Sequence, residues 1–215
     1  HDGSAGAEGN PFDTLILDNG TDWAAINDAG RTVVTALDNS TSGNNRLILI
    51  GVNDVPQFNS GGGPLNKGWV FETEFRILQG DANGRAFANF GVRAENETGR
   101  AAWVGLTDDG GAGGAGQIAF VQPTGLLTSS AADLNVDALI GDGQYHNFRL
   151  HKYLNRTGNV LNRTVDVFMD GNLVLSTPYN SLPQDAAGQP DIQAFASNTP
   201  TPLSEANVDS IGFTM

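Results

Sequence analysis

Apolar residues along this chain recur at every second position within short segments, and almost nowhere at the spacing of a helix. Successive side chains of a β-strand point to opposite faces, so a period of two is typical of strands. The segments are rich in β-branched and aromatic residues and are bounded by Gly, Asn, Asp or Pro. We therefore predict about twelve strands, at Thr14–Leu17, Thr32–Leu37, Arg46–Gly51, Gly68–Leu78, Ala86–Glu95, Ala101–Thr107, Gln117–Val121, Tyr145–Tyr153, Arg163–Met169, Leu173–Ser176, Asp191–Ala196 and Val208–Phe213.

The alternation is clearest in Gly68–Leu78, Ala86–Glu95 and Tyr145–Tyr153, each of which pairs an apolar face with a polar one. Antiparallel sheets commonly bury one face and leave the other in water. Many short strands at even spacing are typical of a sandwich or a closed barrel. We predict an all-β fold, a two-sheet antiparallel β-sandwich of the jelly-roll type.

Turn residues separate the predicted strands, but none of these turns resembles a linker between domains. Glycine tracts at 59–63 and 108–116 have strands on both sides, and Asp170-Gly171 between two apolar runs predicts a tight hairpin. Leu126–Leu139 is the one stretch in which a short helix is expected. A chain of 215 residues buries enough surface to fold without disulfides, and it contains no cysteine. We predict one domain over residues 1–215.

The net charge of −13, with two lysines and no cluster of Lys or Arg, argues against nucleic acid or an anionic membrane as a partner. No apolar run is long enough to span a membrane. The sequence begins without a visible leader segment, which predicts a processed form or an excised part of a larger protein. The composition is typical of extracellular β proteins, so a secreted or cell-surface location is expected.

The polar strand faces are the first candidate site. If they are neighbours on one sheet, they form a groove of charged and aromatic groups that suits the hydroxyls and C–H faces of a polysaccharide or other glycan. The alternative is a wet sheet face with solvated charges. The candidate ligand-binding residues are Glu74, Arg76, Arg93, Arg149, His151 and Tyr153.

Two of these patterns also permit catalysis. Glu72 and Glu74 point the same way, roughly 6.5–7 Å apart at the backbone, which is compatible with a glycosidase carboxylate pair, although Arg76 in the same row can pair with Glu74. His151 and Tyr153 can act as base and acid in polysaccharide elimination, with a uronate carboxylate neutralised by Arg93, Asn89 or Arg149. Metalloprotease, nucleophile-elbow and P-loop motifs are absent.

Oxygen ligands at the two ends of the chain predict a structural calcium ion. The segment from Asp18 through Gly20 to Asp22, together with Asp209 near the C-terminus, offers the hard oxygens that Ca²⁺ prefers. The alternative is that Asp18-Asn19-Gly20 is only a turn. His1 with a second histidine can in principle chelate copper, but a terminal His is more often a remnant of processing or of a tag.

Three segments resemble the concanavalin A-like lectin and glucanase superfamily, in particular its laminin G-like members. They are Gly143–Leu150 (GQYHNFRL), Val165–Gly171 (VDVFMDG) and Val208–Phe213 (VDSIGF). The resemblance implies a jelly roll whose last strand pairs with the first, and it implies a calcium ligand at Asp209, with Asp18 and Gly20 as less secure partners. The glucanase strand motif lacks its third acid here, at Glu72-Thr73-Glu74-Phe75-Arg76, and the motif set of alginate lyases with this fold is absent.

The sequence therefore supports three functions in order of preference. The first is an extracellular carbohydrate-binding or adhesion domain with a structural calcium. The second is a polysaccharide-cleaving enzyme, a lyase rather than a glycoside hydrolase. The third is a structural spacer domain without a ligand. Function inferred from a fold alone is analogy. The choice among these three functions therefore depends on how the fold arranges the polar residues.

Overall fold

The structure is a computed structural model, and it describes residues 14–17, 21–38, 47–50, 69–77, 88–95, 100–107, 116–121, 127–139, 141–157, 160–182, 191–193 and 204–214. Within these ranges the chain forms β-strands and two short 3-10 helices, η2 and η3. The strands are β1 (Thr14–Leu17), β2 (Thr21–Asp28), β3 (Arg31–Asp38), β4 (Leu47–Ile50), β5 (Trp69–Ile77), β6 (Ala88–Glu95), β7 (Arg100–Thr107), β8 (Gln117–Val121), β9 (Leu127–Asp133), β10 (His146–Thr157), β11 (Val160–Met169), β12 (Asn172–Pro178), β13 (Asp191–Gln193) and β14 (Ser204–Thr214); η2 spans Val136–Ala138 and η3 spans Tyr179–Ser181.

Strand alternation sorts the side chains of the central strands as the sequence predicts. In β5 the side chains at 71, 73, 75 and 77 are buried, and those at 70, 72, 74 and 76 are partly exposed. In β10 the buried positions are 146, 148, 150 and 152, and those at 149, 151 and 153 are partly exposed. A one-residue slip would exchange the two faces, so burial of the apolar set fixes the register.

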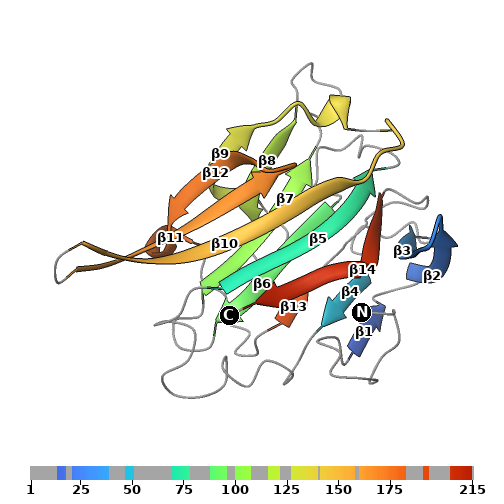
Figure 1. The fold of residues 1–215 in the computed structure, drawn as a ribbon, viewed down its shortest axis with the longest axis horizontal. Helices are drawn as coiled ribbons and strands as arrows, with labels where there is room; N and C mark the ends of the chain where they lie inside the picture. Colours follow the sequence, from blue (N-terminus) through green and yellow to red (C-terminus); the bar gives the residue numbers. More distant parts are fainter. Residues whose placement is uncertain are drawn as a thin grey trace.

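The strands form a seven-stranded sheet in the order β12-β11-β10-β5-β14-β3-β2, a five-stranded sheet in the order β13-β6-β7-β8-β9, and a two-stranded sheet of β1 and β4. Every pairing is antiparallel. In Figure 1 the five-stranded sheet lies behind the seven-stranded sheet. At one side β12 contacts β8 and β9, and further along β5 contacts β6.

The core lies between these two sheets. Phe71, Phe75, Phe148 and Leu150 from the seven-stranded sheet are fully buried, as are core residues of the five-stranded sheet. The buried apolar residues of β7 and β8 are Ala102, Val104, Leu106, Ile118, Ala119 and Phe120. At roughly 1.5–3 kcal/mol for each large apolar side chain, this burial is the main stabilising contribution to the fold.

The Asp170-Gly171 hairpin is confirmed. Met169 at the end of β11 pairs with Asn172 at the start of β12, which leaves a two-residue loop between them. Both loop residues have positive φ, 50° at Asp170 and 79° at Gly171. Two consecutive positive φ angles are the signature of a type I′ turn, whose twist matches that of antiparallel strands.

The structure departs from the sequence prediction at three places. β2 was not predicted. In 126–139, where a short helix was expected, residues 127–133 form β9 and the helical part is the single 3-10 turn η2. The last strand, β14, pairs with β5 and β3 rather than with the first strand, which pairs with β4. The C-terminal strand β14 therefore does pair with a strand from the N-terminal part of the chain, but that strand is β3 rather than β1.

Candidate functional site

The candidate site lies on the face of the seven-stranded sheet that turns away from the core, which we call the outer face. Its described side chains come from β5, β10 and β11, with Ser176 added from β12. They include Val70, Glu72, Glu74, Arg76, Asn147, Arg149, His151, Tyr153, Thr164, Asp166, Phe168 and Ser176. Of the six predicted ligand-binding residues, five lie on this one face.

His151 and Tyr153 form a stacked pair on β10. Their ring centroids are 3.6 Å apart and the ring planes are inclined by 33°. Across the strand pairing, His151 lies opposite Asp166 of β11 and Val70 of β5. The Ser176 hydroxyl donates a hydrogen bond of 2.6 Å to Oδ1 of Asp166. The stacked rings therefore stand beside a polar pair formed by Asp166 of the adjacent strand β11 and Ser176 of β12.

The surroundings of His151 favour its neutral form. Partial burial lowers the pKa of the imidazole, and the positive charge of Arg149 lowers it further, whereas Asp166 acts in the opposite direction. Desolvation and a neighbouring cation both disfavour a charged imidazole. At neutral pH the ring is consequently available as a hydrogen-bond acceptor or as a base.

Arg149 joins the His151–Tyr153 pair to the neighbouring strands. Its guanidinium carbon lies 4.4 Å from the centroid of the Phe168 ring, and its Nη1 lies 3.7 Å from Oε1 of Glu72. The Arg149 side chain is 37% exposed, yet its Nε is buried and has no hydrogen-bond partner among the residues that the structure describes. The exposed part of this stacked guanidinium is well suited to binding an oxygen-rich ligand.

A second group of interacting polar side chains lies around Asp28, the last residue of β2. Oδ2 of Asp28 accepts a hydrogen bond of 3.1 Å from the Tyr145 hydroxyl and lies 3.4 Å from Nη1 of Arg76. The Arg76 guanidinium carbon lies 4.9 Å from the centroid of the Tyr145 ring. Arg76 thus forms an ion pair with Asp28, a partner that the sequence pattern does not predict.

The four residues of the predicted lyase site are divided between the two sheets. His151 and Tyr153 belong to β10, but Asn89 and Arg93 belong to β6 in the five-stranded sheet, and their side chains lie outside the described ones. His151 and Tyr153 point away from the core, and the arginine on their face that acts on His151 is Arg149. The candidate hydrolase pair, Glu72 and Glu74, lies on the outer face opposite Arg149 and Asn147 respectively.

The predicted calcium ligands are only partly described. Asp18 and Gly20 lie outside the described residues. Asp209 belongs to β14, within the stretch between Asn207 and Gly212 where the pairing with β5 shifts register, but its side chain is not described. Among the described residues no group of three or more His, Asp or Glu side chains is arranged to hold a metal ion.

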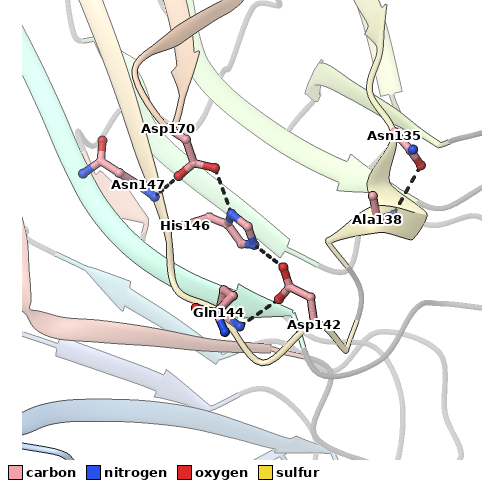
Figure 2. A network of polar contacts seen from close by, with 7 residues as sticks. All are labelled: Asn135, Ala138, Asp142, Gln144, His146, Asn147 and Asp170. Atoms are coloured by element: carbon pink, nitrogen blue, oxygen red, sulfur yellow. Dashed lines mark hydrogen bonds and ion pairs between the residues drawn. The ribbon is translucent and has the colours of Figure 1, made fainter.

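A cluster that the sequence interpretation missed lies on the other side of β10. His146 has Nδ1 2.8 Å from Oδ2 of Asp170 and Nε2 3.2 Å from Oδ2 of Asp142, as Figure 2 shows. The alternation within Tyr145–Tyr153 predicts His146 on the apolar face of the strand and predicts neither carboxylate partner. The signal was present, because Asp170 lies in the predicted hairpin turn and both residues belong to the segments that resemble the laminin G-like pattern.

The comparisons with known proteins concern the fold. No protein family model matches the chain, and no curated protein matches it. A carbohydrate esterase from the Shiga toxin-encoding bacteriophage phi24B is 16% identical with a TM-score of 0.50, covering 93% of this chain and 88% of that one. The metal-free form of lectin I-B4 from Griffonia simplicifolia is 12% identical (TM-score 0.43; 95% and 96% covered), and an alginate lyase of polysaccharide lyase family 7 is 11% identical (TM-score 0.43; 89% and 81% covered).

The fold is therefore an all-β antiparallel sandwich, as predicted from the sequence. This is the fold class that the resemblance to the concanavalin A-like lectin and glucanase superfamily implies. Sequence identities this low assign no ligand and no activity to this chain. No helix among the described residues is long and apolar enough to cross a membrane.

Proposed function

We propose that this protein binds carbohydrate on the outer face of its seven-stranded sheet, at a site centred on His151, Tyr153 and Arg149. The observation that carries the proposal is the stacked His151–Tyr153 pair beside the Arg149 guanidinium on one partly exposed face. Aromatic faces pack against the C–H groups of a sugar ring, and a few convergent polar groups fix its orientation. The Asp166–Ser176 pair and Glu72 supply acceptors and a hydroxyl next to these rings.

The arrangement favours an elongated glycan over a single sugar. Along β10 the side chains at 147, 149, 151 and 153 follow one another on the outer face, with the Tyr145 ring just before them. At about 3.3 Å per residue, the extended segment from 145 to 153 is roughly 26 Å long. Aromatic rings near both ends, with charged groups between, offer successive contacts to a chain of sugars.

The test is a polysaccharide array followed by calorimetric titration with the glycan that the array selects. Tyr153→Ala is expected to weaken binding about two- to tenfold, since an aromatic contact contributes about 0.5–1.5 kcal/mol. Arg149→Lys, which keeps the charge and loses the planar fork, is also expected to weaken it. Gln117→Ala is the matched control, because Gln117 is exposed on β8 of the other sheet.

Two outcomes contradict the proposal in different ways. Binding that Tyr153→Ala leaves unchanged would keep the carbohydrate function and move it away from this face. Absence of binding to every glycan would leave the spacer domain as the remaining explanation. Running the array with calcium and with a chelator tests the proposed structural ion, whose support is the acidic, oxygen-rich sequence around Asp18, Gly20 and Asp209. Secretion to the cell exterior is part of the same proposal.

One observation favours a second candidate, a polysaccharide lyase. The lowered pKa of His151 keeps its imidazole in the basic form, and Tyr153 stands against it as the proton donor. In this candidate Arg149 neutralises the uronate carboxylate. The same polysaccharides, incubated with the protein, would show rising ultraviolet absorbance from unsaturated uronates. If absorbance rises and His151→Gln abolishes the rise, the protein is an enzyme; a flat trace with measurable binding leaves the binding domain.

A further inference from the structure

His146 is held between two carboxylates at the start of β10. The side chain is on the buried face of the strand, and the residue is 8% exposed. Its Nδ1 faces Asp170 in the β11–β12 turn, and its Nε2 faces Asp142 in the segment before β10, as Figure 2 shows. β5 presents the uncharged ring of Phe75, with its centroid 6.0 Å away. The charged groups that the described residues place against the imidazole are these two carboxylates.

The number of hydrogen bonds that His146 forms with the two carboxylates depends on the protonation of its ring. A neutral imidazole carries one N–H, and an ionised carboxylate can only accept. Both contacts of His146 are hydrogen bonds only when both ring nitrogens carry a proton. When the ring is neutral, one nitrogen turns a lone pair toward a carboxylate oxygen, and that contact becomes unfavourable.

The two sides of the cluster are not equally secure. Asp170 is also held by its backbone, since its N–H donates to the carbonyl of Asn147 at 2.8 Å and its Oδ1 accepts from the N–H of Asn147 at 2.8 Å. Asp142 is exposed and lies between Gly141 and Gly143, whose φ angles are 69° and 75°. Among the described residues, its Oδ1 accepts a hydrogen bond only from the nearby N–H of Gln144, at 2.8 Å. The contact between His146 and Asp142 is therefore the one that breaks first.

We propose that Asp142 and His146 form a pH-governed latch, closed when the imidazole carries two protons and opened when Nε2 loses its proton. Opening frees the segment Gly141–Tyr145 from the start of β10, while Asp170 keeps its bond to Nδ1. The carbonyl of Ile77, which accepts from the N–H of Gly141 at 3.0 Å, holds the other end of the segment. Tyr145 moves with the segment, so its contact with Asp28 loosens too. The latch does not depend on carbohydrate binding.

The direct test is nuclear magnetic resonance of the His146 ring nitrogens and of the Gln144 amide, in the intact chain, between about pH 5 and 8, where histidine changes its charge. We expect Nε2 to carry a proton in the closed form and to lack it in the open form, while Nδ1 keeps its proton in both. The opening equilibrium seen at the Gln144 amide, corrected for intrinsic exchange, should rise about tenfold as the charge-assisted bond is lost.

Asp142→Asn provides the discriminating variant. An Asn amide can donate to the neutral Nε2, so we expect the segment to stay closed at the basic end and its pH response to disappear. Asp133→Asn removes the same charge from an exposed position at the end of β9 and should respond as the unmodified protein does. A ring that keeps one protonation state throughout, an amide whose opening does not change with pH, or an Asp142→Asn variant with the original response would overturn the latch.

Discussion

At the scale of single residues, the environment of a side chain decides its chemistry more than its type does. His146 and His151 lie on the two faces of β10. His146 touches two carboxylates, whereas His151 stacks on Tyr153 and lies near Arg149. Strand alternation predicted which face each one takes. It did not predict the partners of His146, because they come from a turn and a preceding loop whose positions depend on the tertiary fold.

His151 makes a prediction about pH and stability. Burial first, and Arg149 second, lower its pKa in the folded chain below the ordinary value, so the unfolded chain binds more protons near pH 6.5. Stability then rises with pH through this window. The contribution is present above about pH 6.5 and is lost as the pH falls toward the folded pKa. His151→Gln, which does not titrate, should lose less stability than the unmodified protein between about pH 7 and 5.

The measurement is urea denaturation of both proteins at several pH values. Only the difference between the two curves is assigned to His151, because every other group of the chain is common to both proteins. Parallel curves would contradict the assigned effect, and a His151→Gln variant that loses more stability than the unmodified protein as the pH falls would reverse its direction.

At the scale of elements, local sequence predicts strands and turns well where one face is apolar and the turn residues are distinctive. β5, β8, β10 and the Asp170-Gly171 turn belong to this group. β9 does not, because Leu127–Asp133 is rich in Ser and Ala and lacks an alternation of large apolar residues. This segment is a strand because it pairs with β8. Strand propensity depends strongly on such context. β2 was missed because its first residues, Thr21 and Asp22, were assigned to a calcium loop.

The hairpin turn gives a prediction at this scale. Gly171 has a φ of 79°, and a Cβ built on it meets nothing within 4 Å. Gly171→Ala should therefore destabilise the protein by the conformational cost alone, about 1–2 kcal/mol. Gly171→Asn should cost less, because Asn adopts positive φ more readily. Urea denaturation measures both values; equal costs for Ala and Asn would show that the backbone conformation is not the cause.

At the scale of the whole molecule, alternation predicts two sheets but cannot assign strands to them. Asn89 and Arg93 have the same alternating pattern as His151 and Tyr153, so the sequence grouped them into one site. The fold places β6 and β10 in different sheets. Which strands become neighbours depends on long-range pairing, such as that of β14 with β5 and β3. The composition of a site on a sheet is therefore the part of the prediction that one sequence supports least.

Whether the two sheets fold as one unit, as the predicted single domain requires, can be tested through Phe148. This side chain is fully buried and packs edge-on against Phe71, with ring centroids 6.4 Å apart. Phe148→Ala should lower the free energy of unfolding by about 3–5 kcal/mol, as large-to-small changes in a core do. Phe168→Ala is the matched control, because Phe168 lies on the outer face and is only partly buried; its loss should be less than half as large.

Hydrogen exchange then shows how far the loss extends. If the inner faces form one cooperative core, Phe148→Ala lowers the protection of the slowest amides in β7 and β8 as much as in β5 and β10, because all of them exchange through the same global unfolding. If the sheets are separate units, the five-stranded sheet keeps its protection while the seven-stranded sheet loses it. That second pattern would contradict the single-domain prediction and would also separate the outer-face site from the stability of β6, since each sheet would then respond to its own substitutions.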